Sequence, residues 1–198
     1  MIERARQVVE REAQAVAALA QQFDAGLEQV LRLLLDCRGH VLVVGVGTSA
    51  AIAQRFAHLL SCCGTPALFF SASDGIHGGA GAVRPEDVVY VISKGGESDE
   101  VNAFVQIARQ RGARIVAHTE APASSLASLS DAVLCVRAAP DVDPFGMIAT
   151  GSSLVNGAAC DALCVLLLEQ RGYSREGFAV THPGGAVGKR LAAEQTRD

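Results

Sequence analysis

The segment HVLVVGVG, from His40 to Gly47, decides the fold class of this sequence. An unbroken apolar run that ends in glycines is typical of a strand buried on both faces of a parallel sheet. Four later segments have the same apolar character and are also expected to be strands: TPALFF (65–70), DVVYVIS (87–93), RIVAHT (114–119) and AVLCV (132–136). The sequence therefore predicts five strands.

Segments with helical spacing of apolar residues surround these strands. They cover residues 49–62, 97–111, 124–129 and 151–171, with a turn or two beyond Gly185 and a loop at 138–149. Residues 2–35 form two helices or one bent helix, with a break near 24–26. Alternating strands and helices predict right-handed crossovers and an α/β fold: a three-layer, doubly wound, five-stranded parallel sheet of the flavodoxin-like type. Residues 1–38 would form a helical arm that packs on the domain or on a partner subunit, and residues 39–198 a single domain.

The composition excludes several classes of protein. The chain has 198 residues, 49% of them hydrophobic, and a mean hydropathy of +0.26, which suits one domain with a large core. A formal net charge of −4 and the lack of a basic run argue against a nucleic-acid partner. We expect no signal peptide and no membrane span, hence a cytoplasmic protein. The six cysteines match no zinc or disulfide framework and are expected to be buried free thiols.

Two loops rich in small polar residues mark a candidate site. GVGTSA (45–50) follows the first predicted strand and SKGGES (93–98) follows the third. Each loop opens a helix, so hydroxyls and helix amides can face an anion there. Ligands of doubly wound sheets bind beyond the carboxyl ends of the strands, near the switch in strand order. The predicted phosphate-binding residues are Gly47, Thr48, Ser49, Ser93, Lys94, Gly95 and Ser98.

Other interpretations of these loops fit less well. A dinucleotide fingerprint needs a glycine where Ala50 stands and an acid near the end of the second strand, where the sequence has serines. No G-x-x-x-x-G-K-[ST] loop is present. Helix capping alone explains either loop singly, and Glu97 and Glu100 would favour the positive end of a helix in any case. Two such loops together favour a two-sided site for one phosphate.

The paired GVGTS and SKGGES loops resemble those of the sugar isomerase (SIS) domain family, whose members bind phosphosugars. The GTS version is similar to the isomerase domain of glucosamine-6-phosphate synthase. THPGGAVGKRL (181–191) and DGIHGGAG (74–81) are similar to segments of arabinose-5-phosphate isomerases, and the likeness runs from about residue 40 to 191. Those enzymes usually carry a tandem CBS pair after this point. The DPFGMIAT segment (143–150) suits a stand-alone branch without it.

The resemblance implies aldose–ketose isomerisation of a phosphosugar through a cis-enediol, most like the interconversion of arabinose 5-phosphate and ribulose 5-phosphate. A base must move a proton between C1 and C2, and an acid/base group must open the ring. Glu100, one turn into its helix, is the expected base, whereas Glu97 is expected to cap or fix the loop. His182 precedes PGG and is the first candidate for ring opening, and His77 is the second. The other histidines are expected to be structural: His40, His58 and His118.

Two positions depart from the arabinose-5-phosphate isomerases. Thr48 stands where they have a lysine, and Asp141, with Asp143 two residues on, stands where they have a functional glutamate. Lys94 would have to replace the lost cation from another direction. A non-catalytic phosphosugar sensor therefore remains an alternative. So does 6-phospho-3-hexuloisomerase, although the HPGGAVGKRL ending argues against it.

The sequence also indicates which cofactors and partners to expect. We expect no metal or other cofactor, because the sequence has no i, i+4 histidine pair and no H-E-x-x-H, and enediol chemistry does not require a metal. The partner would be a small phosphosugar. SIS domains commonly form dimers and tetramers with sites at subunit interfaces. By that resemblance we expect a homo-oligomer, with His77 or His182 acting in a neighbour's site.

Overall fold

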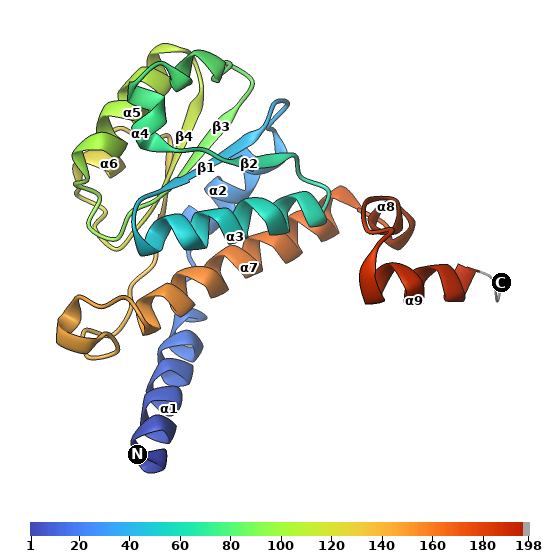
Figure 1. Cartoon of the computed structure of the whole chain (residues 1–198). Helices are drawn as coiled ribbons and strands as arrows, with labels where there is room; N and C mark the ends of the chain where they lie inside the picture. Colours follow the sequence, from blue (N-terminus) through green and yellow to red (C-terminus); the bar gives the residue numbers. More distant parts are fainter. Residues whose placement is uncertain (196–198) are drawn as a thin grey trace.

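The structure is a computed structural model that describes residues 1–195. Its five strands form one fully parallel sheet in the order β2-β1-β3-β4-β5. Their bounds are β1 (Val41–Gly45), β2 (Ala67–Phe69), β3 (Val88–Ile92), β4 (Arg114–Thr119) and β5 (Ala132–Cys135). The predicted doubly wound sheet is confirmed, and β1 and β3 lie at the point where the strand order switches direction (Figure 1).

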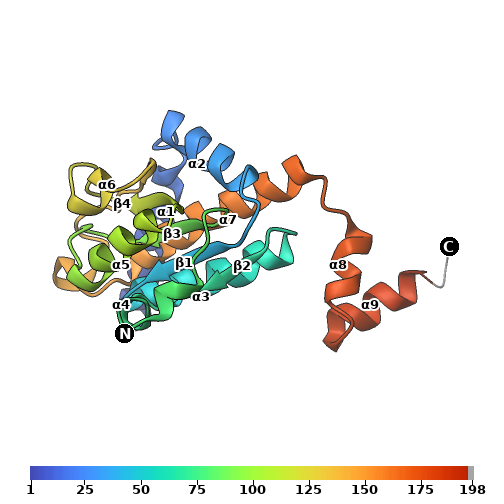
Figure 2. The same cartoon turned by 90° about the horizontal axis from the view of Figure 1, so that it is seen from above.

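Helices cover both faces of the sheet, as the alternating sequence pattern predicts (Figures 1 and 2). One face carries α2 (Ala25–Leu35), α3 (Thr48–Cys62) and α7 (Gly151–Arg171), and the other carries α4 (Ala72–Ile76), α5 (Asp99–Gln110) and α6 (Ser125–Ser128). Successive strand residues alternate between the two layers: Val41 and Val43 pack with α3 and α7, whereas Leu42 and Val44 pack with α5. All residues of β1 and β3 are buried, which explains their unbroken apolar runs.

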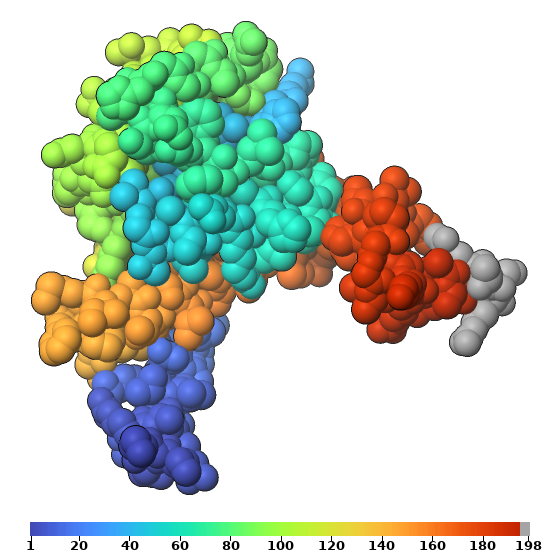
Figure 3. All heavy atoms as spheres, viewed as in Figure 1, coloured from blue at the N-terminus to red at the C-terminus, as the bar shows by residue number. Residues whose placement is uncertain are grey.

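The N-terminal segment consists of two helices, one of the two arrangements that the sequence allowed. The first, α1 (Ile2–Leu19), packs along α7 and buries only Ala15 and Leu19. Asp24 ends the connection, because its side chain accepts a hydrogen bond from the Gly26 N–H and caps α2. The first half of α1 extends away from the sheet and is exposed (Figures 1 and 3).

The C-terminal segment contains more helix than the sequence indicated. After α7 the chain forms α8 (Arg175–Thr181) and α9 (Gly185–Gln195), which project from the domain beside the C-terminal end of α3 (Figures 1 to 3). We call residues 175–195 the C-terminal arm. Three short elements were also not predicted: α4 and the 3-10 helices η1 (Gly79–Ala82) and η2 (Pro144–Gly146). Each is too short to show a helical period in the sequence.

The structure specifies the state of the cysteines and the place of the most apolar helix. All six cysteines are free thiols, but only Cys160 and Cys164 are buried, while the other four are half-buried. Among the described residues, α7 alone is long and apolar enough to cross a membrane by length and composition. Half of its apolar window is buried inside the domain, as in a core helix packed between α1 and α3.

Candidate functional site

The two predicted loops lie side by side at the carboxyl edge of the sheet. Gly45, the last residue of β1, pairs in register with Ile92, the last residue of β3. The segment after Gly45 leads into α3 and the segment after Ile92 leads into α5. These two helices cover opposite faces of the sheet. This is the switch point at which doubly wound sheets bind ligands.

Both helices begin without a side-chain cap. Asp24, Ser71, Ser124 and Ser174 each accept a backbone N–H at the start of α2, α4, α6 and α8. In contrast, α3 begins after Gly47, and the Ser98 hydroxyl before α5 makes no such bond. The first N–H groups of α3 and α5 are therefore left for an anion, and the positive ends of both helices point to it.

Three hydroxyls accompany these N–H groups. In the part of the chain that the structure describes, the hydroxyls of Thr48, Ser49 and Ser98 have no hydrogen-bond partner. Ser93, in contrast, is buried, and its Oγ accepts a hydrogen bond from the Gly96 N–H at 3.2 Å. Ser93 thus shapes the second loop, and its hydroxyl proton remains available for a ligand.

Two glycines are required by the backbone of these loops. Gly47 has φ of +59° and Gly96 has φ of +68°, a region that other residues rarely adopt. A Cβ at Gly96 would also lie 2.2 Å from the Ser124 hydroxyl. The glycines therefore permit the two turns that expose the helix N-termini.

The far side of the second loop is fixed to the start of α6. Gly96 O accepts hydrogen bonds from Leu126 N and from Asn102 Nδ2, at 3.1 and 3.2 Å. Glu97 Oε1 accepts the Ser125 N–H at 2.8 Å, and this hydrogen bond lowers the pKa of Glu97. The expected loop-fixing role of Glu97 is confirmed.

Lys94 extends toward the segment between β5 and α7. Its Nζ lies 3.2 Å from Oδ2 of Asp143, whose carboxylate also accepts hydrogen bonds from the Ser152 N–H and hydroxyl. Burial would raise the pKa of Asp143, but the hydrogen bonds from Ser152 and Lys94 outweigh burial and lower it. The cation predicted to support the phosphate is therefore already paired with an anion.

Asp141, the predicted counterpart of the functional glutamate, is not brought to the loops. Its carboxylate is exposed and lies 4.0 Å from Arg11 Nε of α1, and its carbonyl accepts a hydrogen bond from Arg11. Val142 packs against Gly151 and Asp143 is held by Ser152, so both are buried, whereas Asp141 stays at the surface. Asp143 is the acid that this segment contributes.

Glu100 lies in the first turn of α5, two residues after Ser98. It is half-buried, and its carboxylate has no ion-pair or hydrogen-bond partner among residues 1–195. Glu100 therefore belongs to the uncapped start of α5, beside the second loop. The geometry is consistent with the base role predicted for it.

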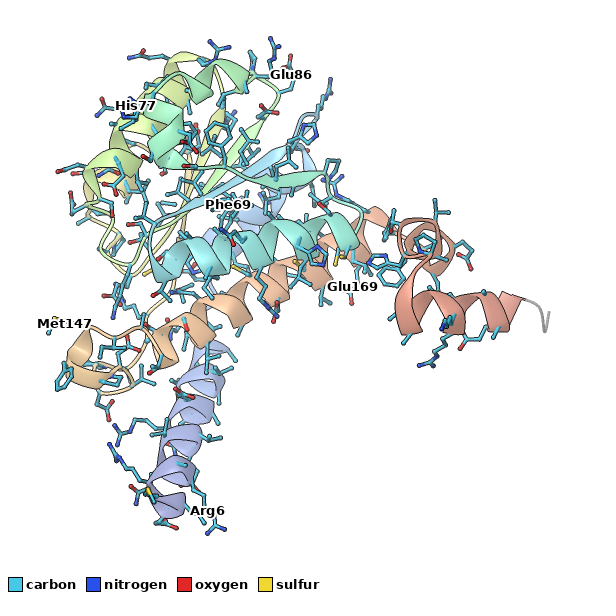
Figure 4. All side chains as sticks on the ribbon, in the orientation of Figure 1. Arg6, Phe69, His77, Glu86, Met147 and Glu169 are labelled. Atoms are coloured by element: carbon cyan, nitrogen blue, oxygen red, sulfur yellow. The ribbon has the colours of Figure 1, made fainter. Side chains whose placement is uncertain are left out.

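His182 and His77 lie away from these loops in the same chain. His182 contacts Cys62, the last residue of α3, whereas Thr48 is the first of its 15 residues, so the two ends of this helix are about 21 Å apart. The neighbours of His77, Ile76 and Gly78, line a pocket with residues of the C-terminal end of α5. Figure 4 shows His77 far from Met147, which lies in the segment leading to α7. One chain therefore places His182 at the far end of α3 from Thr48, and His77 near the C-terminal end of α5.

Three residues around the site were not predicted as part of it. The sequence marks Asp143 only as a neighbour of Asp141, and it gives no role to Ser152 or Asn102. Ser152 holds Asp143, and Asn102 holds the Gly96 carbonyl. Ser152 and Asn102 are polar residues on helices that pack on the sheet, and that is their only signal in the sequence.

Comparisons with known proteins place this geometry among phosphosugar proteins. The model of the SIS domain matches residues 33–176. Arabinose 5-phosphate isomerase KdsD of Shigella flexneri is 36% identical over 186 residues, and the match covers 94% of this chain. KpsF, an arabinose 5-phosphate isomerase of Escherichia coli, is 34% identical over 192 residues and 96% of this chain. The chain spans only 57% and 59% of the lengths of these two relatives.

Solved structures share the fold over nearly the whole chain. A Listeria monocytogenes protein proposed to be a sugar-phosphate isomerase superimposes with a TM-score of 0.89 at 32% identity, covering 92% of this chain and 96% of that one. An Escherichia coli CFT073 protein in complex with A5P superimposes with a TM-score of 0.88 at 28% identity, covering 92% and 97%. The resemblance of the paired loops is thereby confirmed, and the chain belongs to the SIS domain family.

Proposed function

We propose that this chain is a phosphosugar aldose–ketose isomerase that acts through a cis-enediol, most like the interconversion of arabinose 5-phosphate and ribulose 5-phosphate. One observation carries the proposal. Two uncapped helix N-termini meet at the switch point. Beside them lie three hydroxyls and, in the first turn of α5, a glutamate, and none of these side chains has a partner among residues 1–195. This arrangement binds a phosphate and holds a base next to the sugar attached to it.

The comparisons support the same reaction. Relatives over most of this chain are named arabinose 5-phosphate isomerases, and a structural neighbour was solved with A5P. In our proposal the phosphate is held by Ser49, Ser93 and Ser98 with the backbone at Gly47, Thr48 and Gly95. Glu100 moves the proton between C1 and C2. Lys94 adds positive charge to the site, but its ion pair with Asp143 partly neutralises that charge.

The histidines require a second copy of the chain. We propose a homo-oligomer, a dimer or a tetramer, in which His182 or His77 of one copy reaches the phosphate loops of another. Both histidines lie away from the loops of their own chain, and the C-terminal arm, which contains His182, projects from the domain (Figure 3). A largely apolar groove of about 650 Å³ between α1, α3 and α7 offers surface for such assembly.

A phosphosugar sensor is the second candidate, and one observation favours it. The family lysine is replaced by Thr48, and the remaining loop cation, Lys94, is paired with Asp143. A pure binding module tolerates that loss of charge, whereas an enzyme must stabilise an enediolate by other donors. The two candidates differ in whether the sugar exchanges protons with solvent.

Proton NMR of aldose and ketose phosphates in D2O tests the proposal. The panel contains arabinose 5-phosphate, ribulose 5-phosphate and the common hexose phosphates. We expect deuterium at C1 or C2 and conversion of one sugar into another. Binding without exchange for every sugar would reject the isomerase and leave the sensor.

The Glu100→Gln variant identifies the base. It keeps the shape of the side chain and removes its proton affinity, so we expect exchange to fall at least about a hundredfold while phosphosugar binding is retained. Glu28→Gln, in the first turn of α2 on the exposed surface, is the matched control and should leave exchange unchanged. Full activity of Glu100→Gln would assign the base elsewhere.

A further inference from the structure

Three side chains meet at the C-terminal end of α3, away from the phosphate loops. His58 and Cys62 stand one turn apart on this helix, and His182 approaches from the end of α8. The Cys62 Sγ lies 3.6 Å from His58 Nε2 and 3.4 Å from His182 Nε2. The thiol therefore lies between two imidazole nitrogens, one from α3 and one from the C-terminal arm.

The second nitrogen of His182 determines the tautomer of the ring. Nδ1 lies 3.1 Å from the carbonyl oxygen of Phe178, which only accepts, so the neutral ring carries its proton on Nδ1. The Thr181 hydroxyl donates to the same carbonyl, so its oxygen, 3.0 Å from Nδ1, is an acceptor too. His182 Nε2 is then left with a lone pair, and this lone pair points to Cys62.

Only one proton arrangement satisfies all three groups when they are neutral. The lone pair of His182 Nε2 needs a donor, and the Cys62 S–H is the group within reach. The thiol has a single proton, so His58 Nε2–H must donate to the sulfur in turn. The order of donation runs from His58 through Cys62 to His182.

The Phe178 ring stacks on the His182 ring and fixes its orientation, in addition to the contacts of the two ring nitrogens. The two rings stack with centroids 3.8 Å apart and an angle of 19° between their planes. Phe178 and Thr181 belong to α8 and move with His182, whereas Cys62 and His58 belong to the domain. The thiol contact therefore links the ring of His182, and with it the arm, to α3.

We propose that Cys62, supported by His58, is a positioning residue for His182. The inference rests on the proposed function, in which His182 opens the sugar ring. S–H is a weak donor, so it holds the Nε2 lone pair in place and gives way when a sugar hydroxyl offers a stronger hydrogen bond. Cys62 lies at the other end of α3 from the phosphate loop of its own chain.

The kinetic effect of removing the thiol follows from this role. Cys62→Ala should lower kcat about tenfold, because a ring that is misplaced by a fraction of an ångström transfers protons poorly. KM should change less than about twofold, because the phosphate loops lie at the other end of α3. Cys62→Ser retains a donor at the same place and should recover most of kcat. Cys135→Ala, another half-buried free thiol, is the matched control.

A second readout does not depend on activity. In protein labelled with 15N at histidine, His182 should show distinct Nδ1–H and bare Nε2 signals in the wild type and in Cys62→Ser. In Cys62→Ala the ring is free on its Nε2 side, and the two signals should broaden or shift toward an average. His58→Ala, on an exposed helix face, should give a smaller change of the same kind and serves if Cys62→Ala folds poorly.

The two readouts separate the two proposals. If no phosphosugar is converted at all, the proposed function fails, and the 15N spectra still decide whether Cys62 positions His182. Unchanged His182 signals in both Cys62→Ala and His58→Ala would overturn the inference. So would a folded, active Cys62→Ala with wild-type kcat.

Discussion

Lys94 and Asp143 form an ion pair across the carboxyl ends of the sheet, with Nζ 3.2 Å from Oδ2. The Asp143 side chain is 1% exposed and the Lys94 side chain 40%, so the anion is buried and the cation is at the surface. Asp143 also accepts two hydrogen bonds from Ser152 in the first turn of α7. The pair therefore joins the second phosphate loop, which leads into α5, to α7 on the other face of the sheet.

We expect Asp143→Ala to destabilise the fold. The substitution leaves the Ser152 N–H without its acceptor and Lys94 without its counter-ion, which should cost about 2–4 kcal/mol of unfolding free energy. Asp141→Ala, two residues earlier and exposed, should cost less than about 0.5 kcal/mol. Urea denaturation of both variants measures the difference. Equal effects of the two substitutions would contradict the buried pair.

Substitutions of the loop serines should weaken phosphosugar binding. Ser49→Ala and Ser98→Ala each remove one hydroxyl that has no partner within residues 1–195. A hydrogen bond to a charged group contributes about 1.5–3 kcal/mol, so each variant should lose roughly ten- to a hundredfold in affinity. Titration calorimetry with a non-isomerising sugar phosphate measures this loss.

The control for the serine variants is Ser128→Ala. Its hydroxyl donates to the Ser125 carbonyl on the exposed end of α6 and should not affect binding. Wild-type affinity in Ser49→Ala and Ser98→Ala would show that the ligand does not lie between the two helix ends.

The buried histidine His118 should make stability fall in mild acid. Burial lowers the pKa of His118 from 6.5 to about 4, an effect that its hydrogen bond to Asn156 only partly offsets. Between these values the unfolded chain binds a proton that the folded chain does not, so stability rises with pH in this window and falls toward pH 4. The loss should be about 3 kcal/mol.

Urea denaturation between pH 4 and 7 measures that loss. His118→Gln cannot titrate and should show a shallower dependence on pH, although it is less stable at pH 7 because Tyr90 and Asn156 lose their partner. His40→Gln, at an exposed position, should keep the wild-type dependence. Identical pH profiles for wild type and His118→Gln would contradict this account.

The sheet and the phosphate loops could be predicted because local patterns determine them. Residues 41 to 44 are all apolar, so both faces of this strand are apolar. This pattern is typical of a parallel strand that is buried on both faces. Ser49 and Ser98 stand at the starts of helices that follow strands paired with each other, so topology alone brings them together. Glu97 was assigned to the loop for the same local reason.

Other parts of the site depend on contacts between distant segments, which no local pattern shows. Asp141 and Asp143 are the same residue type in one loop, and only the contacts of Asp143 with Ser152 and Lys94 distinguish them. His182 precedes a Pro-Gly-Gly segment as expected, but its distance from Thr48 follows from where the arm leaves α7. Whether a histidine completes a site in its own chain or in another is a property of the assembly.

Mixing two inactive variants tests whether the site is shared between copies. Suppose that Glu100 of one chain acts with His182 of another in a symmetric dimer. A heterodimer of Glu100→Gln and His182→Ala then has one site with both substitutions and one site with neither. Random mixing makes half of the dimers heterodimers, so about a quarter of wild-type activity should return. A higher oligomer built from such pairs gives the same fraction.

The matched control pairs two variants from the same set of loops. Glu100→Gln and Ser98→Ala alter residues that lie in one α5 N-terminus, so every site in their mixture keeps one defect and no activity should return beyond that of the parents. Co-expression with two different tags, followed by sequential purification, isolates the heterodimers and should raise the first mixture to about half of wild-type activity. If the purified heterodimer of Glu100→Gln and His182→Ala stays inactive, Glu100 and His182 do not meet across an interface, and ring opening must be assigned to a group close to Glu100 in its own chain or to His77 of a neighbour. A His77→Ala variant in the same mixing experiment distinguishes these two cases, because only a histidine supplied by the second copy restores activity on mixing.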